Sequence, residues 1–311
     1  MNIKIIFPKI FFTKEQLQAL GKSNNVEFIE GKNIDLEKIS DLFKPNGYIL
    51  VVDPTYLKDG WNGFPVDRVK RMKGLKALCL TTTSFSWVDG KKLSEMGVTV
   101  TNTPGKSTEA VAEFNIFMMF SLLRRLSLVA KNNWKMDYDN FLNEEANGLT
   151  AGIVGLGKIG YRVAELCNGL GMNVCYWNRS KKKTSFKAET LENLFAKSDV
   201  IFNTLATPPE LKGFLNKDLI SKLKKTSVIV STSDVHVFDE DFVVKQVENG
   251  KLGGYAFENT EKKFTEYRGN IMVFPEQAYF TKGTLLNTAR IVTETVLSVL
   301  RLKGKPINKI N

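Results

Sequence analysis

The chain has 311 residues, of which 43% are hydrophobic and 25% are charged, and this ordinary globular composition is sufficient for two domains with separate cores. No apolar run approaches the roughly 20 residues that a bilayer span needs, so we expect a cytoplasmic protein with no membrane partner. The net charge of +11 comes mostly from lysines scattered along the chain. Because nucleic-acid sites need dense basic patches, we expect no nucleic-acid partner.

The three cysteines, Cys79, Cys167 and Cys175, have apolar neighbours and no metal-ligand spacing. Such surroundings are typical of buried thiols rather than of a disulfide framework or a metal site. The sequence therefore predicts three buried thiols and no metal centre.

The first third of the chain alternates short apolar runs rich in β-branched residues with amphipathic stretches. The runs predict strands at residues 3–7, 26–29, 48–52, 77–80 and 98–101, and the stretches 14–20 and 66–72 predict helices between them. Alternating strands and helices imply a parallel sheet that is covered on both faces. A long helix follows from Thr108 to about Val129, and its crowded apolar residues predict that it is largely buried.

A polar stretch, residues 131–148, precedes a second alternating series. Apolar runs predict strands at residues 151–154, 174–177, 200–204, 227–230, 254–257 and 271–274. We expect these strands to form a separate nucleotide-binding sheet. A closing helix is predicted from Thr284 to Leu302, and we expect it to return to the first domain.

A glycine-rich segment comes directly after the first strand of the second series. Gly155, Gly157 and Gly160 form the pattern G-x-G-x-x-G, and an amphipathic helix runs from Ile159 to Leu170. In this pattern the first glycine permits a tight turn and the second lets the backbone approach a pyrophosphate. The third lets the helix pack on the strand, and the helix N-terminus faces the phosphates. The segment therefore predicts a dinucleotide site.

The strand at residues 173–177 is expected to end beside the ribose of the adenosine, where NAD-specific proteins usually carry Asp or Glu. Here the sequence is Asn178, Arg179, Ser180 and Lys181. An acid would repel a 2′-phosphate, whereas an amide, a guanidinium and a hydroxyl bind one. NADP(H) is therefore favoured over NAD(H), and the alternative is an exposed basic loop with no ligand.

From about residue 75 onward, the chain resembles the D-isomer-specific 2-hydroxyacid dehydrogenases, which include formate and glycerate dehydrogenases. The matching segments, in order, are residues 98–105, 111–114, 124–125, 149–160, 205–213 and 249–254. The resemblance implies an α/β fold with a Rossmann dinucleotide-binding domain and a flavodoxin-like substrate domain, both doubly wound parallel sheets. It places the substrate domain at residues 1–100 and 285–311 and the NADP-binding domain at residues 101–284. It also implies a small-molecule substrate and a homodimer.

Together with the glycine pattern, the resemblance implies a set of cofactor-binding residues. They are Gly155, Leu156, Gly157, Lys158, Ile159, Gly160, Asn178, Arg179, Ser180, Leu205, Ala206, Pro208, Thr232 and Ser233.

The resemblance also locates the catalytic positions, and the chain departs from the family at each of them. The family grips its substrate with an arginine and exchanges the hydroxyl proton through a histidine that a glutamate partners. The matching positions, in the order arginine, glutamate and histidine, hold Asp234, Thr260 and Glu276. A shift of register brings Glu258 or Glu261 to the glutamate position. No shift produces the missing arginine or histidine.

Two further features bear on the active site. The family's carboxylate-binding G-x-G is replaced by Thr82-Thr83-Ser84, so Thr82 and Ser84 are candidate substrate contacts. The single histidine, His236, lies two residues beyond Asp234, and a structural hydrogen bond is favoured for it over a role as a proton shuttle.

The inverted charge beside an intact cofactor motif supports an NADP(H)-dependent oxidoreductase that acts on a non-standard carbonyl or imine substrate. An acid in place of arginine repels the carboxylate of an ordinary 2-hydroxy acid but attracts an amine or iminium group. Either Asp234 or Glu276 can pair such a group, and either carboxyl group can donate the proton if burial raises its pKa. The loss of all three catalytic residue types supports the alternative, a catalytically inactive NADP-binding sensor or regulatory protein.

Overall fold

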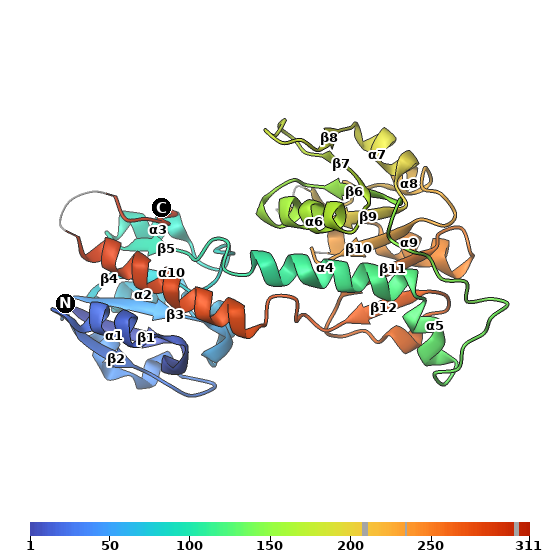
Figure 1. Ribbon diagram of the computed structural model, residues 1–311. Helices are drawn as coiled ribbons and strands as arrows, with labels where there is room; N and C mark the ends of the chain where they lie inside the picture. Colours follow the sequence, from blue (N-terminus) through green and yellow to red (C-terminus); the bar gives the residue numbers. More distant parts are fainter. Residues whose placement is uncertain (207–210, 234, 302–304) are drawn as a thin grey trace. The chain divides into compact units, whose positions relative to one another are not determined.

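The computed structural model describes residues 1–206, 211–233, 235–301 and 305–311. The chain forms two compact units, which are drawn in Figure 1: unit 1 is Met1–Lys106 with Lys282–Asn311, and unit 2 is Ser107–Thr281. The resemblance places the corresponding boundaries at 100/101 and 284/285. Each unit is a parallel sheet flanked by helices, which confirms the predicted α/β class.

Unit 1 contains a five-stranded parallel sheet in the order β2-β1-β3-β4-β5, which is the flavodoxin-like order. The strands are β1 Asn2–Ile6, β2 Asn25–Phe28, β3 Tyr48–Val52, β4 Leu75–Leu80 and β5 Thr99–Thr101. The helices are α1 Lys14–Gly21, α2 Val66–Arg71, α3 Gly90–Glu95 and α10 Lys282–Leu300. Five 3-10 turns connect them among the described residues: η1 Lys9–Phe11, η2 Leu36–Lys38, η3 Ser40–Phe43, η4 Pro54–Tyr56 and η5 Gly60–Asn62.

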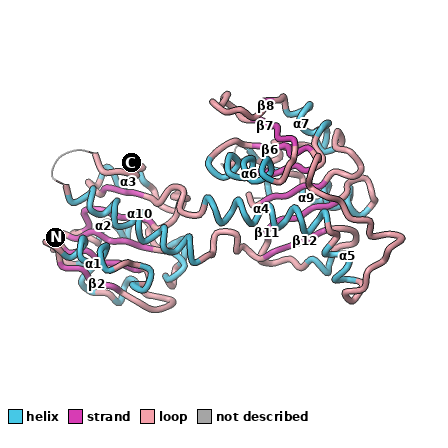
Figure 2. Tube along the Cα trace, viewed as in Figure 1, coloured by secondary structure: helices cyan, strands magenta, loops and turns pink. Residues whose placement is uncertain are grey.

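The alternation of side chains along the strands gives unit 1 a hydrophobic core on each face of its sheet. Ile3 and Ile5 of β1 are fully buried on one face, where Ala289 and Val292 of α10 belong to the same cluster. Ile6 belongs to the cluster on the opposite face. Figure 2 shows α10 as the long helix of this unit, and it contacts α1 and β4. A helix from the carboxyl end of the chain therefore completes the core of the amino-terminal sheet.

Unit 2 contains a seven-stranded parallel sheet in the order β12-β11-β10-β9-β6-β7-β8, a Rossmann arrangement with one added strand. The strands are β6 Thr150–Val154, β7 Asn173–Trp177, β8 Lys187–Ala188, β9 Val200–Asn203, β10 Val228–Ser231, β11 Gly254–Glu258 and β12 Ile271–Phe274. The helices are α4 Thr108–Leu123, α5 Leu126–Lys131, α6 Lys158–Gly169, α7 Leu191–Lys197, α8 Lys217–Ile220 and α9 Glu240–Glu248, with 3-10 turns η7 Val235–Val237 and η8 Phe264–Glu266.

The long apolar helix is largely buried, as predicted, but it is not one continuous helix to residue 129. It ends at Leu123, and Arg125 adopts a left-handed conformation with φ of 50° before α5 begins. The buried Asn270 explains the break, because its Nδ2 donates to Leu122 O at 2.9 Å and its Oδ1 accepts from Ser127 Oγ at 3.0 Å. One side chain from before β12 thus binds the end of α4 and the start of α5.

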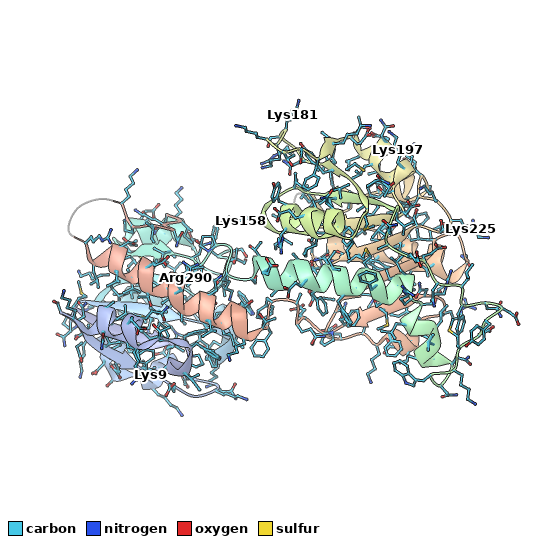
Figure 3. The ribbon with its side chains drawn as sticks, in the orientation of Figure 1. Lys9, Lys158, Lys181, Lys197, Lys225 and Arg290 are labelled. Atoms are coloured by element: carbon cyan, nitrogen blue, oxygen red, sulfur yellow. The ribbon has the colours of Figure 1, made fainter. Side chains whose placement is uncertain are left out.

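The three cysteines are buried free thiols, which confirms the prediction. Burial raises the pKa of Cys79 to about 11 and that of Cys167 to about 12. Within the described ranges, no helix is long and apolar enough to cross a membrane. The basic side chains labelled in Figure 3 come from separate segments of the chain; they are Lys9, Lys158, Lys181, Lys197, Lys225 and Arg290.

Candidate active site

The candidate site lies at the carboxyl edge of the unit 2 sheet. Because all seven strands are parallel, the loops that follow them emerge at the same edge. The register pairs Val154 of β6 with Asn203 of β9, and Asn203 with Ser231 of β10, so three of these loops start at one level. The strand order reverses between β6 and β9, which is where dinucleotides bind in such sheets.

Each glycine of the glycine-rich loop is required for a different physical reason. Gly155 has φ of +94°, and a Cβ there would lie 3.0 Å from the Leu205 side chain. A Cβ on Gly160 would lie 2.1 Å from Gly155 O and 2.5 Å from Thr204 Oγ1, so no larger residue fits where α6 crosses β6. A Cβ on Gly157 would meet no atom within 4 Å. The backbone at Gly157 therefore faces open space at the start of α6, as a pyrophosphate requires.

A cavity of about 650 Å³ lies beside this loop, within the usual size range of ligand pockets. Its lining residues come from the ends of β6, β7 and β9 and from the segment before α8. They are Gly155, Gly157, Trp177, Asn178, Arg179, Ser180, Lys182, Thr204, Leu205, Ala206, Leu211 and Phe214. The Trp177 and Phe214 rings, with centroids 5.3 Å apart, give the cavity an apolar wall that the sequence did not indicate.

The remaining predicted cofactor residues that the structure describes do not line this cavity. Leu156 and Lys158 line a neighbouring cavity of about 480 Å³, which shares Gly157 and Lys182 with the first. Ile159 and Gly160 lie in the first turn of α6 and line neither cavity. Pro208 lies outside the described residues.

Asn178 braces the glycine-rich loop. Its Oδ1 accepts a hydrogen bond from Leu156 N–H at 3.1 Å, and its Nδ2 donates to Ser180 O at 2.8 Å. The amide therefore joins the loop after β6 to the loop after β7. Both ends of the side chain are engaged within the protein, so its contribution to a ligand is mainly to shape the cavity.

A second brace holds the basic loop that follows Asn178. The Tyr176 hydroxyl accepts from Lys182 N–H at 3.2 Å and donates to Lys182 O at 3.4 Å. Arg179 and Ser180 remain exposed between the two braces. The loop thus presents a guanidinium, a hydroxyl and an ammonium group to the cavity.

Thr232 and Ser233 follow β10 and lie at the same edge, although they do not line the cavity. Ser233 Oγ donates to Leu205 O at 2.9 Å, which ties the loop after β10 to the loop after β9. Thr232 Oγ1 accepts from Nδ2 of the fully buried Asn115 on α4 at 2.9 Å. Among the described residues, Asn115 Oδ1 is one of the few buried polar atoms with no hydrogen-bond partner.

The acidic residues at the ends of β11 and β12 differ in their surroundings. Glu258, the last residue of β11, is half-buried and accepts from Gln277 N–H at 2.7 Å and Ala278 N–H at 2.9 Å. Burial raises the pKa of Glu258, and the negative charge of Glu276 adds to the rise. Thr260, at the family's glutamate position, is exposed. The half-buried carboxyl group at this edge therefore belongs to Glu258, which the sequence places at the family's glutamate position only after a shift of register.

Two of the residues considered for catalysis, Asp234 and His236, follow β10 in the sequence. Asp234, at the family's arginine position, lies outside the described residues. His236 is exposed in η7, and its carbonyl oxygen accepts from Gly213 N–H at 2.8 Å.

The predicted substrate loop of unit 1 follows β4. Thr82 is buried, and its hydroxyl donates to Ser84 O at 2.6 Å while it accepts from Trp87 Nε1 at 3.3 Å. Ser84 is exposed, with its hydroxyl 3.4 Å from that of Ser86. Thr82 therefore holds the shape of the loop, and Ser84 is the hydroxyl open to a ligand.

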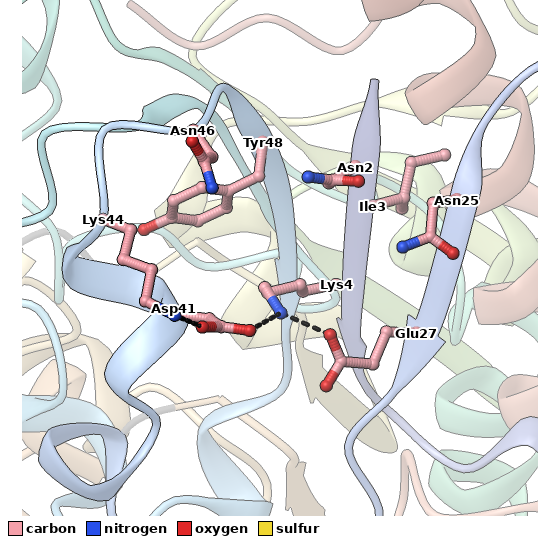
Figure 4. A pocket seen from close by; sticks show the side chains of 9 residues that line it. All are labelled: Asn2, Ile3, Lys4, Asn25, Glu27, Asp41, Lys44, Asn46 and Tyr48. Carbon is pink, nitrogen blue, oxygen red and sulfur yellow. Dashed lines mark hydrogen bonds and ion pairs between the residues drawn. The ribbon is translucent and has the colours of Figure 1, made fainter.

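A smaller cavity of about 190 Å³ lies at the opposite, amino edge of the unit 1 sheet. Figure 4 shows the buried Lys4 between Glu27 and Asp41, with Lys44 also paired to Asp41. These charges compensate one another, and ligands of open α/β sheets bind at the carboxyl edge. We therefore assign this cluster to the structure of unit 1. The described residues contain no group of three or more side chains suited to hold a metal ion.

The fold and the glycine-lined cavity define a dinucleotide-binding α/β protein. The family model for the NAD-binding domain of D-isomer-specific 2-hydroxyacid dehydrogenases matches residues 116–280, just over half of the chain. The chain belongs to this family and is an oxidoreductase.

Individual proteins show the same relationship. The chain is 26% identical to the glyoxylate reductase of Aeropyrum pernix, with 98% of this chain and 96% of the relative covered. It is 27% identical to the D-3-phosphoglycerate dehydrogenase of Bacillus subtilis, with 95% of this chain and 56% of the relative covered.

Solved structures share the fold over the whole chain. An acyclic imino acid reductase in complex with NADPH and D-Arg has a TM-score of 0.80 at 22% identity, with 100% of each chain covered. D-2-hydroxyisocaproate dehydrogenase has a TM-score of 0.78 at 19% identity, with 100% of this chain and 99% of that chain covered. At these identities the likeness establishes the fold alone.

Proposed function

We propose that the chain is an NADP(H)-dependent reductase whose substrate is an imine or carbonyl compound other than a plain 2-oxo acid. The observation that carries this proposal is the half-buried Glu258 carboxyl group, which lies on the same sheet edge as the glycine-rich loop and whose pKa is raised by burial and by the charge of Glu276. Unit 2 would bind the cofactor and unit 1 the substrate. The homodimer and the cytoplasmic location remain predictions.

The residues present are suited to a dinucleotide. Gly157 and the start of α6 would hold the pyrophosphate, since the backbone there faces open space. Arg179 and Ser180, with Lys182 beside them, would bind a 2′-phosphate through charge-assisted hydrogen bonds. The apolar wall of the cavity would receive the adenine ring. The bound cofactor would supply the hydride.

The chain's own residues would handle the charge and the proton. Reduction of a C=N bond requires a hydride at carbon and a proton at nitrogen. A carboxyl group whose pKa is raised keeps its proton to higher pH than an ordinary glutamate, so Glu258 is suited to hold that proton. The neighbouring charge of Glu276 would favour a cationic nitrogen. The imino acid reductase that shares the fold binds NADPH, which supports the proposal by analogy.

The same substitutions support a second candidate, an NADP-binding sensor without catalysis. Asp234, Thr260 and Glu276 replace all three of the family's catalytic residue types. The sensor and the reductase both require cofactor binding, and only the reductase requires turnover.

The test titrates the purified protein with NADPH and with NADH, following cofactor fluorescence, and then adds 2-oxo acids, aldehydes and cyclic imines. We expect NADPH to bind more tightly and to be oxidised by one of these classes. Arg179→Gln should weaken NADPH binding but not NADH binding, whereas Lys225→Gln, which removes an exposed charge elsewhere on unit 2, should change neither. Tight NADPH binding without turnover would favour the sensor, and a preference for NADH would contradict the cofactor assignment.

The role of Glu258 is tested on the class that reacts. Glu258→Gln keeps an oxygen that can accept the two backbone N–H bonds but removes the ionisable proton. We expect turnover to fall while NADPH affinity is unchanged. The matched control is Glu266→Gln, which removes an exposed carboxylate from the same unit. Equal turnover in the two variants would exclude Glu258 as the proton donor.

A further inference from the structure

Asn115 is a fully buried amide on the face of α4 that packs against the unit 2 sheet. The residues three and four positions away on this face are the buried Val111, Ala112, Met118 and Met119. A polar side chain among apolar neighbours is costly unless it is hydrogen-bonded. The bonds that Asn115 makes therefore indicate why an amide stands at this position.

The Asn115 side chain is only partly hydrogen-bonded. Its Nδ2 donates to Val111 O at 2.8 Å, within its own helix, and to Thr232 Oγ1 at 2.9 Å. Its Oδ1 has no partner in the part of the chain that the structure describes. An unpaired buried oxygen lowers stability, and a leucine of similar volume would avoid that cost. The amide is thus better explained by what it does for Thr232 than by what it contributes to the core.

Thr232 is half-buried and directly follows β10 at the carboxyl edge of the sheet. The next residue, Ser233, ties this loop to the loop after β9 by donating to Leu205 O at 2.9 Å. The Thr232 side chain is held from α4 instead. Because its oxygen accepts the bond from Asn115, its hydroxyl hydrogen is able to donate to another group.

The strand order indicates which end of a dinucleotide meets this loop. β7 and its basic loop lie on one side of β6, and β9 and β10 lie on the other. A dinucleotide binds across the point where the strand order reverses, with one nucleotide on each side. The basic loop suits the adenosine end with its 2′-phosphate, and Thr232 does not line the cavity beside that loop. The loop after β10 therefore lies toward the nicotinamide end.

We propose that Asn115 is a positioning residue for the nicotinamide end of the cofactor. Its bond to Thr232 holds the loop after β10 and keeps the threonine hydroxyl as a donor for the carboxamide oxygen of the nicotinamide. Asn115 is fully buried and acts only through Thr232. The inference rests on the proposed function, since it concerns the cofactor proposed there.

The test compares NADPH with 2′-phospho-ADP-ribose, which has the adenosine, the 2′-phosphate and the pyrophosphate but lacks the nicotinamide. Calorimetry measures the affinity of the full-length protein for each. Asn115→Leu removes the bond to Thr232 at similar volume, and Thr232→Val removes only the hydroxyl group. One lost hydrogen bond predicts NADPH binding about 3- to 10-fold weaker in either variant. The affinity for 2′-phospho-ADP-ribose should not change.

Two comparisons separate positioning from a general loss of stability. The double variant should bind NADPH no more weakly than either single variant, because both changes remove the same interaction. The control is Asn270→Ala, which removes a buried amide bound to Leu122 O near the end of the same helix. It should lower the melting temperature without changing the ratio of the two affinities, whereas Asn115→Leu should change the ratio with a smaller loss of melting temperature.

The inference is overturned if Asn115→Leu weakens both ligands equally or neither of them, or if the losses in the double variant add. Failure of the proposed function is a separate result, in which the unaltered protein binds NADPH without turnover or prefers NADH. If NADH is preferred, NADH and ADP-ribose replace the phosphorylated pair, and the same ratio decides. If Asn115→Leu does not fold, Thr232→Val is judged by the same comparison.

Discussion

Replacing Asn178 with aspartate is expected to shift cofactor preference from NADPH toward NADH. The amide oxygen of Asn178 accepts from Leu156 N–H at 3.1 Å, and a carboxylate can accept the same bond. The donation from Nδ2 to Ser180 O at 2.8 Å is lost, because a carboxylate has no donor. The substitution therefore keeps half of the brace and adds a negative charge beside the exposed Arg179.

The two effects differ in how they act on the cofactors. Losing one hydrogen bond of the brace costs about 0.5–1.5 kcal/mol and weakens both cofactors alike. Like charges roughly 6 Å apart repel by about 3 kcal/mol at an effective dielectric constant of about 20, and salt reduces this. This repulsion acts mainly on NADPH, which carries the 2′-phosphate. We therefore expect the ratio of NADPH to NADH affinity to fall by about 10- to 100-fold, since about 1.4 kcal/mol corresponds to a factor of ten.

The assay measures both dissociation constants by fluorescence titration for the unaltered protein, Asn178→Asp and Asn178→Ala. The alanine variant loses both bonds of the brace without adding charge, so it should weaken NADPH and NADH equally. A thermal melt of each variant checks that the fold is intact. The reasoning is refuted if Asn178→Asp and Asn178→Ala have the same ratio of NADPH to NADH affinity.

Three other predictions follow from buried groups. The folded-state pKa of Glu258 is raised, so the native protein binds its proton more tightly than the unfolded chain, and stability is lost as the pH rises from the ordinary value near 4.5 through the raised value. Above that pH window Glu258→Gln should melt at a higher temperature than the unaltered protein, and below it the two should not differ in this way. Equal pH dependence of the two melting temperatures would contradict this prediction. Cys79 and Cys167, with pKa values raised to about 11 and 12, should resist iodoacetamide near neutral pH until the protein unfolds; rapid labelling of native protein, read by mass spectrometry, would show that they are not buried. Asn270→Ala should lower the free energy of unfolding by about 2–4 kcal/mol, because it leaves the buried Leu122 O and Ser127 Oγ without this hydrogen-bond partner. A denaturant titration that finds no loss would show that the helix break does not depend on Asn270. The control is Asn24→Ala, which removes a half-exposed amide that donates one hydrogen bond.

The sequence predicted the structure correctly wherever a local pattern is compatible with only one backbone arrangement. The spacing of Gly155, Gly157 and Gly160 predicted a strand, a tight turn and a helix start, because Gly155 needs positive φ, Gly160 excludes a side chain, and the backbone at Gly157 must stay open to a phosphate. Runs of β-branched residues predicted both parallel sheets. The family resemblance added the class of protein. These features depend on neighbours along the chain or on steric limits at single residues.

Local pattern was insufficient where partners are distant in sequence. The predicted helix to residue 129 is broken because Asn270 binds Leu122, 148 residues away. Nothing near residue 270 or 122 signals that contact. The apolar wall formed by Trp177 and Phe214 likewise depends on the end of β7 and the segment before α8, which meet only in the folded unit.

Some features of the candidate site could likewise be predicted from the sequence, and others depend on the folded structure. The sequence by itself determined that a dinucleotide loop is present and that acids replace the family's cationic residues. Only the tertiary structure decided that Asn178 braces the loop and that Glu258 rather than Thr260 is the half-buried group. The physical reason is that residue type fixes the charge a side chain can carry. Burial and hydrogen-bond partners, which the folded chain alone supplies, determine the pKa and the use of that charge.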